Sequence, residues 1–156
     1  MTEGRRVSAS RAEYSELAMP NDANPLGSLF GGKVMALVDL AASIAAHRHA
    51  RGPVVTASVD NMNFLYPVRI GELVMCYSQV NRVFRTSMEV GVRVMVENMS
   101  TGEKRHTSSA YLTFVALGPD GARVPLPPVI PETDDERRRY EEALLRREAR
   151  LRLRNK

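Results

Sequence analysis

The sequence predicts an α+β fold in which one long helix packs on a curved antiparallel sheet. Residues 30–49 are rich in Ala, Leu, Val and Met and contain no proline, which predicts an interior helix that is apolar on almost every face. After Gly52-Pro53 the apolar residues change to the two-residue period of strands, and the linkers between successive strand candidates are short. Short linkers favour antiparallel neighbours, and one helix followed by a run of strands belongs to the α+β class.

The clearest strand candidate begins at Thr86, where apolar and polar residues alternate over TSMEVGVRVMVEN. This alternation predicts a half-buried strand with Glu89 and Arg93 on its polar face. Residues 13–19 are a possible first strand. Turn signals bound the remaining strands, which we expect over residues 54–66, 72–83 and 105–117.

We expect three regions in the chain. They are a flexible N-terminal tail (residues 1–12), one folded domain (residues 13–131) and a charged C-terminal helix (residues 132–156). The last helix is predicted from Thr133-Asp-Asp-Glu136, a capping-box pattern, and from the run of arginines that follows it and suits the helix dipole. One helix covers only one face of so long a sheet, so the other face or the edges need a partner subunit.

Composition narrows the class of partner. The chain has 156 residues with 22 basic and 18 acidic side chains, which fits one ordinary domain. Residues 13–131 hold ten of each sign, so the domain offers no broad basic surface and we expect no nucleic-acid partner. The single cysteine, Cys76, excludes an internal disulfide and favours a reducing compartment. Because neither a signal peptide nor a spanning segment is visible, we expect a cytoplasmic protein with no membrane partner.

The loop before the long helix contains GSLFGGK, whose spacing matches a phosphate-binding loop. Val34 stands where such a loop needs a Ser or Thr to hold Mg²⁺, and no buried strand candidate precedes it, which disfavours nucleotide hydrolysis. Two interpretations of Gly31 and Gly32 stay open. Their backbone N–H groups are free to bind an oxyanion at the positive end of a helix dipole, or the two glycines only let the helix pack closely on a strand.

Asp39 is the most informative single residue. It lies two turns into the apolar helix, where a buried ionised carboxylate needs a partner or a task. It is either a structural carboxylate or a general base or nucleophile. Asn21, Asp22 and Asn24 in the preceding loop are ordinary turn formers, but that loop can also place an amide side chain near the same oxygen.

Other hydrolytic and metal-binding patterns are missing from the sequence. There is no GxSxG, Cys76 is expected in the core of a strand, and His47 and His49 point to different sides of a helix end. We therefore expect neither a thiol nucleophile nor a metal site. The turn from Val83 to Met88 and the arginines of the last helix could bind phosphate or amide groups, or could be an ordinary turn and a solvated face.

The chain resembles the hotdog-fold acyl-CoA thioesterases, specifically the bacterial acyl-CoA hydrolases and their eukaryotic relatives, in four segments: MPNDANPLGSLFGGKVMALVDLAA, VVTASVDNMNF, VFRTSMEVGVRVMVEN and SSAYLTFVA. The resemblance covers about residues 13–118. Its most specific part is the N-x-x-G-x-x-F-G-G loop with an Asp seven residues after the last Gly. It implies a hotdog fold, a dimer in which two sheets join and, commonly, a trimer of such dimers.

The resemblance also implies an activity, the hydrolysis of fatty acyl-CoA to free fatty acid and coenzyme A without a cofactor. It places a catalytic acid at Asp39 and an asparagine at Asn24, contributed by the two subunits of a dimer. Backbone N–H groups of Gly31 or Gly32 would stabilise the oxyanion, while Asp39 activates water or attacks directly. The expected coenzyme A contacts are Ala57, Ser58, Val59, Arg85, Thr86, Ser87, Met88 and, as a candidate for the phosphates, Arg150.

A domain of this fold can serve two other functions. A sensor that binds acyl-CoA or another CoA-like nucleotide without turning it over stays open. A dehydratase is disfavoured, because it normally needs a His with a carboxylate and no His lies in the loop or at the core of the helix.

Overall fold

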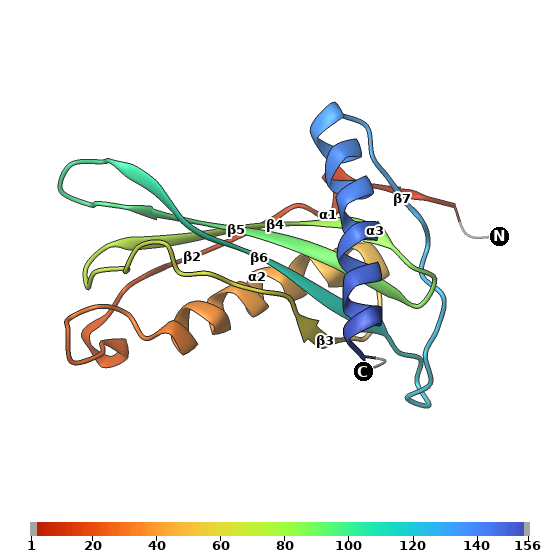
Figure 1. Ribbon diagram of the computed structural model, residues 1–156, viewed down its shortest axis with the longest axis horizontal. Helices are drawn as coiled ribbons and strands as arrows, with labels where there is room; N and C mark the ends of the chain where they lie inside the picture. Colours follow the sequence, from red (N-terminus) through yellow and green to blue (C-terminus); the bar gives the residue numbers. More distant parts are fainter. Residues whose placement is uncertain (1–2, 155–156) are drawn as a thin grey trace.

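The structure is a computed structural model that describes residues 3–154, and Figure 1 shows its arrangement. A long helix lies under a curled sheet, and a second long helix crosses the other face of that sheet. The predicted α+β class is therefore confirmed. The elements in chain order are β1 (Arg5–Arg6), α1 (Val7–Ser10), β2 (Ala12–Leu17), the short 3₁₀ turn η1 (Pro20–Asp22), α2 (Gly31–Ala50), β3 (Val54–Val59), β4 (Leu73–Val83), β5 (Ser87–Glu97), β6 (Lys104–Ala116), β7 (Val129–Ile130) and α3 (Asp134–Arg154).

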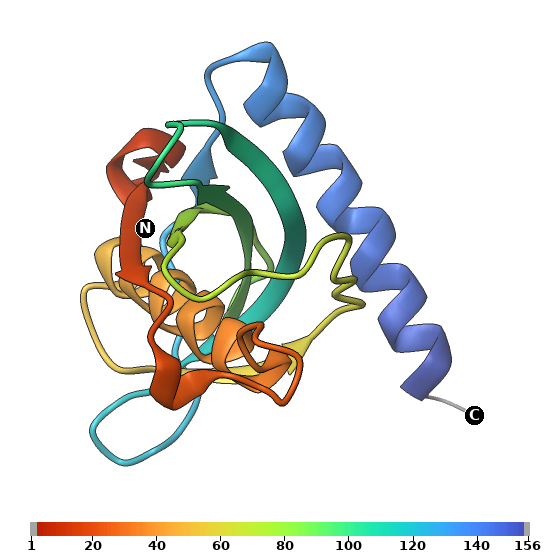
Figure 2. The same ribbon diagram turned by 90° about the vertical axis from the view of Figure 1, so that its left-hand side faces the viewer.

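Five strands form one antiparallel sheet in the order β2-β4-β5-β6-β3. Figure 2 shows this sheet curling around α2, with α3 outside the curl. The alternating valines of β5 face the helix because strand side chains point to opposite faces in turn. The core between sheet and helix includes Leu37, Val38, Ala41, Ala45, Val74, Cys76, Val90, Val94, Leu112 and Phe114.

Helix α2 buries one side and exposes the other. It ends where Arg51 takes a left-handed conformation (φ 57°) and donates its backbone N–H to the carbonyl of His47. Small alanines on the buried side let the sheet approach closely. On the exposed side, Met35 and Leu40 keep 43% and 48% of their surface accessible. The expectation of a helix buried nearly all round is therefore wrong for a single chain, because the sheet wraps only part of it.

Strand β3 is shorter than predicted. It ends at Val59, whereas the sequence pattern suggested a strand as far as Tyr66. Only two backbone hydrogen bonds join residues 60–66 to β6. The N–H of Asp60 donates to the Tyr111 carbonyl, and the N–H of Leu65 donates to the Thr107 carbonyl. The asparagines in this segment favour turns over strand, which explains the early end.

Residues 5–12 correct the expectation of a flexible tail. Strand β1 pairs in parallel with β7, and α1 buries Val7 and Ser10 almost completely. The hydroxyl of Ser10 donates to the Val7 carbonyl and accepts the backbone N–H of Val80. A short segment with one buried apolar side chain and a satisfied hydroxyl is thereby held against the sheet.

Helix α3 begins with the predicted capping box. The N–H of Glu136 donates to the Thr133 hydroxyl at 3.0 Å, and the Glu136 carboxylate accepts from that hydroxyl and from Arg11. The helix covers part of the outer face of the sheet, and Glu89, on the predicted polar face of β5, is completely buried. Across residues 3–154, no helix is long and apolar enough to cross a membrane.

Candidate active site

Two pockets lie on opposite sides of strand β3, and residues of that strand line both of them. A bulge in the strand explains this. Thr56 pairs with Phe114 and Ser58 with Thr113, so Ala57 is an extra residue without a partner on β6. The extra residue interrupts the usual alternation of faces. As a result, Thr56 and Val59 line a pocket beside α2, while Ala57 and Ser58 line a pocket beneath α3.

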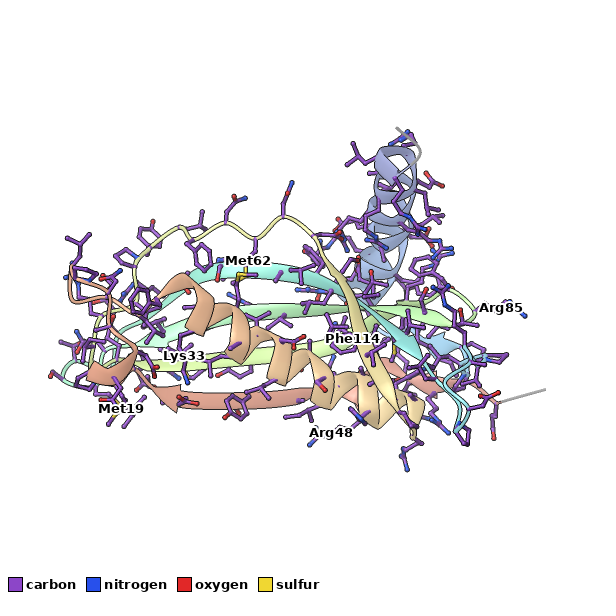
Figure 3. The ribbon with its side chains drawn as sticks, turned by 90° about the horizontal axis from the view of Figure 1, so that it is seen from below. Met19, Lys33, Arg48, Met62, Arg85 and Phe114 are labelled. Atoms are coloured by element: carbon purple, nitrogen blue, oxygen red, sulfur yellow. The ribbon has the colours of Figure 1, made fainter. Side chains whose placement is uncertain are left out.

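The first pocket, called here the α2 pocket, has a volume of about 310 Å³. Asp39 and Thr56 supply its acidic and hydroxyl groups, and the rest of its wall is mainly apolar. Figure 3 shows Met62, from the segment after β3, reaching toward the helix above this space. The lining residues are Gly32, Met35, Ala36, Val38, Asp39, Thr56, Val59, Met62 and Leu112.

Asp39 lies on the exposed side of α2, which corrects the expectation of a buried acid in the single chain. Its Oδ1 accepts a hydrogen bond from the Thr56 hydroxyl at 2.7 Å. This bond holds the carboxylate at the wall of the α2 pocket and leaves its other oxygen available. Sequence reasoning missed Thr56, because a threonine in a strand is too common to carry a signal by itself.

The start of α2 carries two free backbone donors, and one of them belongs to Gly32, which lines the same pocket. Phe30, the N-cap residue, makes no side-chain capping bond. Among the described residues, the N–H groups of Gly31 and Gly32 have no acceptor. A Cβ added to Gly32 would meet no heavy atom within 4 Å, and one added to Gly31 would only touch the Phe64 ring at 3.5 Å. Close packing within the chain therefore does not require either glycine, which favours the interpretation of an open N–H site.

Asn24 organises the loop that leads to this helix. Its Oδ1 accepts the backbone N–H groups of Leu26 and Ser28 at 2.9 Å and 3.1 Å. Lys33 steadies the same loop, because its ammonium lies 2.9 Å from Glu16 and 3.6 Å from Asp22, and the hydrogen bond that Lys33 donates to Glu16 raises the pKa of Lys33. Within residues 3–154 of one chain, no hydrogen bond joins Asn24 to Asp39.

The second pocket, called here the α3 pocket, has a volume of about 550 Å³. Five of the expected coenzyme A contacts line it, namely Ala57, Ser58, Thr86, Ser87 and Arg150. Sequence reasoning missed Phe84, Thr113 and Arg123, which complete its wall together with Val115, Arg147, Leu151, Leu153 and Arg154. Four arginines around one cavity make it suited to an anionic ligand.

Three of the expected contact residues lie elsewhere. Val59 faces the α2 pocket, and Met88 is fully buried in the core, where its side chain is out of reach of a ligand. Arg85 takes a left-handed conformation (φ 75°) in the turn before β5, and Figure 3 shows it at the end of the molecule, pointing outward. Three of the four arginines that do reach the α3 pocket come from α3, and Arg147 lies 60 residues beyond Ser87, its contact on β5.

Contacts with residues that directly follow the strands hold Arg147 and Arg150 of α3 in place. Arg150 donates to Asp60 at 2.7 Å, and the guanidinium of Arg147 lies 4.6 Å from the centre of the Phe84 ring. Burial raises the pKa of the Asp60 carboxyl, and the charge of Arg150 partly offsets that rise. Sequence spacing gave no signal for these pairs, because their members lie far apart in the chain.

Other candidate chemistry receives no support in the described part of the chain. No group of three or more His, Cys, Asp or Glu side chains there could hold a metal ion. Cys76 is completely buried, and burial raises the pKa of its thiol to about 12. His49 is also buried, with Nε2 at 2.7 Å from the Pro127 carbonyl, on the far end of α2 from Gly31.

Comparisons with known proteins agree with this arrangement. Residues 26–103 match the model of the thioesterase superfamily. The chain is 42% identical to an uncharacterized acyl-CoA thioester hydrolase, YkhA, of Bacillus subtilis, over 86% of this chain and 78% of that protein. A hexameric acyl-CoA thioesterase without ligand superposes with a TM-score of 0.93 at 40% identity, covering 97% of each chain. The acyl-CoA hydrolase of Staphylococcus aureus, solved with butyryl coenzyme A and coenzyme A, superposes with a TM-score of 0.90 at 35% identity, covering 96% of this chain and 92% of its own.

Proposed function

This chain belongs to the acyl-CoA thioester hydrolases of the thioesterase superfamily, and we propose that Asp39 and Asn24 carry its reaction on fatty acyl-CoA. The curled sheet around a long helix is the hotdog fold that the resemblance implied, and that expectation is confirmed. The products are a free fatty acid and coenzyme A, and the reaction needs no cofactor.

The observation that carries the proposal is the composition of the α2 pocket. Gly32 and Asp39 are seven residues apart, so two helical turns place them on the same side of α2, and both line this pocket. The thioester oxygen would accept the free N–H groups of Gly31 and Gly32, where the helix dipole adds to the stabilisation of negative charge. The acyl chain would lie along the apolar wall formed by Met35, Val59 and its neighbours.

Asp39 has two possible roles with this geometry. As a general base it would take a proton from water, whose oxygen then attacks the thioester carbon while the C–S bond breaks. As a nucleophile it would form an anhydride first, which water would then hydrolyse. In both routes the sulfur leaves as the coenzyme A thiolate and takes up a proton.

We propose that Asn24 acts with Asp39 of another subunit. The absence of a bond between them within one described chain fits this assignment, as do the exposed apolar side chains of Met35 and Leu40 beside Asp39. An unpaired edge strand, β3, also lies on this side and could join the sheet of a second copy. By likeness to the hexameric relative, the assembly would be a trimer of such dimers.

We place the coenzyme A part of the substrate in the α3 pocket, on the other side of β3. Ala57, Ser58, Thr86 and Ser87 would contact it, and Arg150 would lie near its phosphates. The thioester would then cross the end of β3 near Val59. The side chains of Arg85 and Met88 lie away from this pocket. These two residues would therefore contact coenzyme A only through their backbones or in the site of a neighbouring subunit. A cytoplasmic location stays a prediction of the sequence.

A thiol-release assay with acyl-CoA substrates of short, medium and long chain tests the proposal. Asp39→Asn and Asn24→Ala should each lower turnover by about a hundredfold or more, because each removes a group that acts at the reacting centre. Asp120→Asn, an acid-to-amide change in an exposed loop, is the matched control and should keep full activity.

Gel filtration of each variant checks that the assembly is intact. Wild-type turnover by purified Asp39→Asn would reject the mechanism. Tight acyl-CoA binding by the wild-type protein without any thiol release would identify a sensor in place of an enzyme.

A further inference from the structure

Glu89 is a fully buried carboxylate on the outer face of β5, outside both the α2 pocket and the α3 pocket. Its two oxygens accept from Nε and Nη2 of Arg146 at 2.8 Å and 2.9 Å, which is the paired geometry that an arginine forms with a carboxylate. Asn81 donates a third hydrogen bond at 2.9 Å. Removing the Glu89 carboxylate and the Arg146 guanidinium from water costs free energy. A buried ion pair with all these hydrogen bonds is therefore a candidate for a specific structural task.

Arg146 is held from a second direction. Its guanidinium lies 3.6 Å from the centre of the Tyr111 ring on β6, so the ring and the Glu89 carboxylate together define its position. Ala143, three residues earlier on α3, is also completely buried. The middle of α3 is therefore fixed on the sheet by Ala143 and Arg146, together with Arg82 of β4, which donates to the Tyr140 carbonyl and lies over the Tyr140 ring.

The residues after Arg146 are those that enter the α3 pocket. Arg147 lies within 3.5 Å of the Ser87 hydroxyl, and Arg150, one helical turn beyond Arg146, reaches Asp60. Both line the α3 pocket. By contrast, Arg137, Arg138 and Arg139 pair with acidic residues of α3 itself, so these pairs do not attach the helix to the sheet.

We propose that Glu89 is a positioning residue for recognition of the carrier part of the substrate. Its buried pair with Arg146 holds the last turns of α3 over the α3 pocket, and this places Arg147 and Arg150 against a phosphorylated, nucleotide-bearing carrier. Thioesters on a carrier that lacks those phosphates do not depend on Glu89. The inference rests on the proposed placement of coenzyme A in this pocket.

The test compares two substrates with the same acyl group, one on coenzyme A and one on pantetheine, which has no nucleotide. Glu89→Gln should raise KM for the acyl-CoA about tenfold, since charge-assisted contacts to phosphate are weakened, and should leave kcat unchanged. KM for the acyl-pantetheine should not change. Glu148→Gln makes the same chemical change on an exposed part of α3 and should alter neither KM.

Arg146→Lys is the second variant, because it keeps the charge beside Glu89 but loses the paired hydrogen bonds and the flat contact with Tyr111. It should also raise KM for acyl-CoA alone, and it decides the question if Glu89→Gln does not fold. Equal rises in KM for both substrates, or no rise for acyl-CoA in a folded variant, would overturn the proposal.

Calorimetric titration with coenzyme A and with pantetheine separates this inference from the proposed hydrolysis. If the wild-type protein releases no thiol, the proposed function fails, while a loss of coenzyme A affinity confined to the Glu89 and Arg146 variants would still support the positioning role. If wild-type protein binds coenzyme A no better than pantetheine, the positioning role is rejected.

Discussion

The hydroxyl of Thr56 donates a hydrogen bond to Oδ1 of Asp39 across 2.7 Å, and this bond joins the edge strand β3 to the central helix α2. The carboxylate of the proposed reaction thus depends on a residue of the strand that separates the two pockets. A strand and a helix move less than a loop, so the bond orients the carboxylate toward the α2 pocket.

The first prediction concerns that bond. Thr56→Val keeps the shape and the branched Cβ of the side chain but removes the donor, and it should lower kcat by roughly tenfold, the effect of losing one hydrogen bond to a charged group. Stability should change little, because residue 56 is exposed in the single chain. Steady-state kinetics and thermal unfolding measure the two effects separately. Thr56→Ser should restore most of the activity, and an inactive Thr56→Ser variant would contradict the argument.

The second prediction separates activity from stability at the start of α2. Gly32→Ala adds a methyl group that meets no atom of the chain but extends into the α2 pocket beside the proposed oxyanion donors. We expect kcat/KM to fall about tenfold or more, while thermal stability is unchanged or higher, since Ala favours a helix over Gly by up to about 1 kcal/mol. Gly52→Ala, which also meets no atom within 4 Å and lies outside both pockets, is the control. Full activity of Gly32→Ala would exclude Gly32 from the oxyanion site.

The third prediction is a loss of stability in mild acid that is due to His49. Burial lowers the pKa of this side chain below its ordinary value of 6.5, and the nearby positive charge of Arg5 adds to the effect. The unfolded chain therefore binds a proton near pH 6.5, whereas the folded chain binds it only at lower pH. The contribution of neutral His49 to stability is complete above pH 6.5 and is lost as the pH falls from 6.5 toward the folded pKa, by at most about 1.4 kcal/mol per pH unit.

Urea unfolding at about pH 7.5 and about pH 5.5 measures this loss as a difference in the free energy of unfolding. His49→Gln should be less stable than the wild type at the higher pH but should lose less stability on acidification. His47→Gln, a change on the exposed side of the same helix end, should behave like the wild type. If both variants lost the same amount of stability between the two pH values, His49 would not be the group responsible.

The fourth prediction concerns the single thiol. Cys76 is completely buried in β4 and burial raises the pKa of its thiol to about 12, so alkylating reagents near neutral pH should not modify the native protein. Mass spectrometry after iodoacetamide treatment should show no label on the native chain and one label per chain after denaturation. Rapid native labelling with loss of thioesterase activity would restore a thiol nucleophile as a candidate.

The sequence predicted the elements of the fold well, because their patterns are local. Residues 30–49 gave α2 to within one residue at each end, and the period of two found β5 and its neighbours. Strand β3 was predicted too long because its register shift at Ala57 and the turn-forming asparagines after it leave no clear break in hydrophobicity. Segment β1–α1 was missed because it depends on pairing with β7, more than a hundred residues further along the chain.

The candidate site was predicted in part. Gly32 and Asp39 share the α2 pocket as their spacing on one helix requires, and five of the expected coenzyme A contacts share the α3 pocket. The exposure of Asp39 could not be predicted, since an apolar helix face gives the same pattern whether the chain itself or a second subunit covers it. The burial of Glu89 could not be predicted either, because only the docking of α3 turns an outward polar residue of a strand into a buried one.

The bulge in β3 has a genetic consequence. Ala57 is the extra residue of the bulge: it has no partner on β6, and it lines the α3 pocket. Loss of this one residue would leave Thr56 opposite Phe114 and Ser58 opposite Thr113 in a regular ladder. A single-codon deletion at position 57 would therefore change the wall of the α3 pocket without shifting the register of the residues around it.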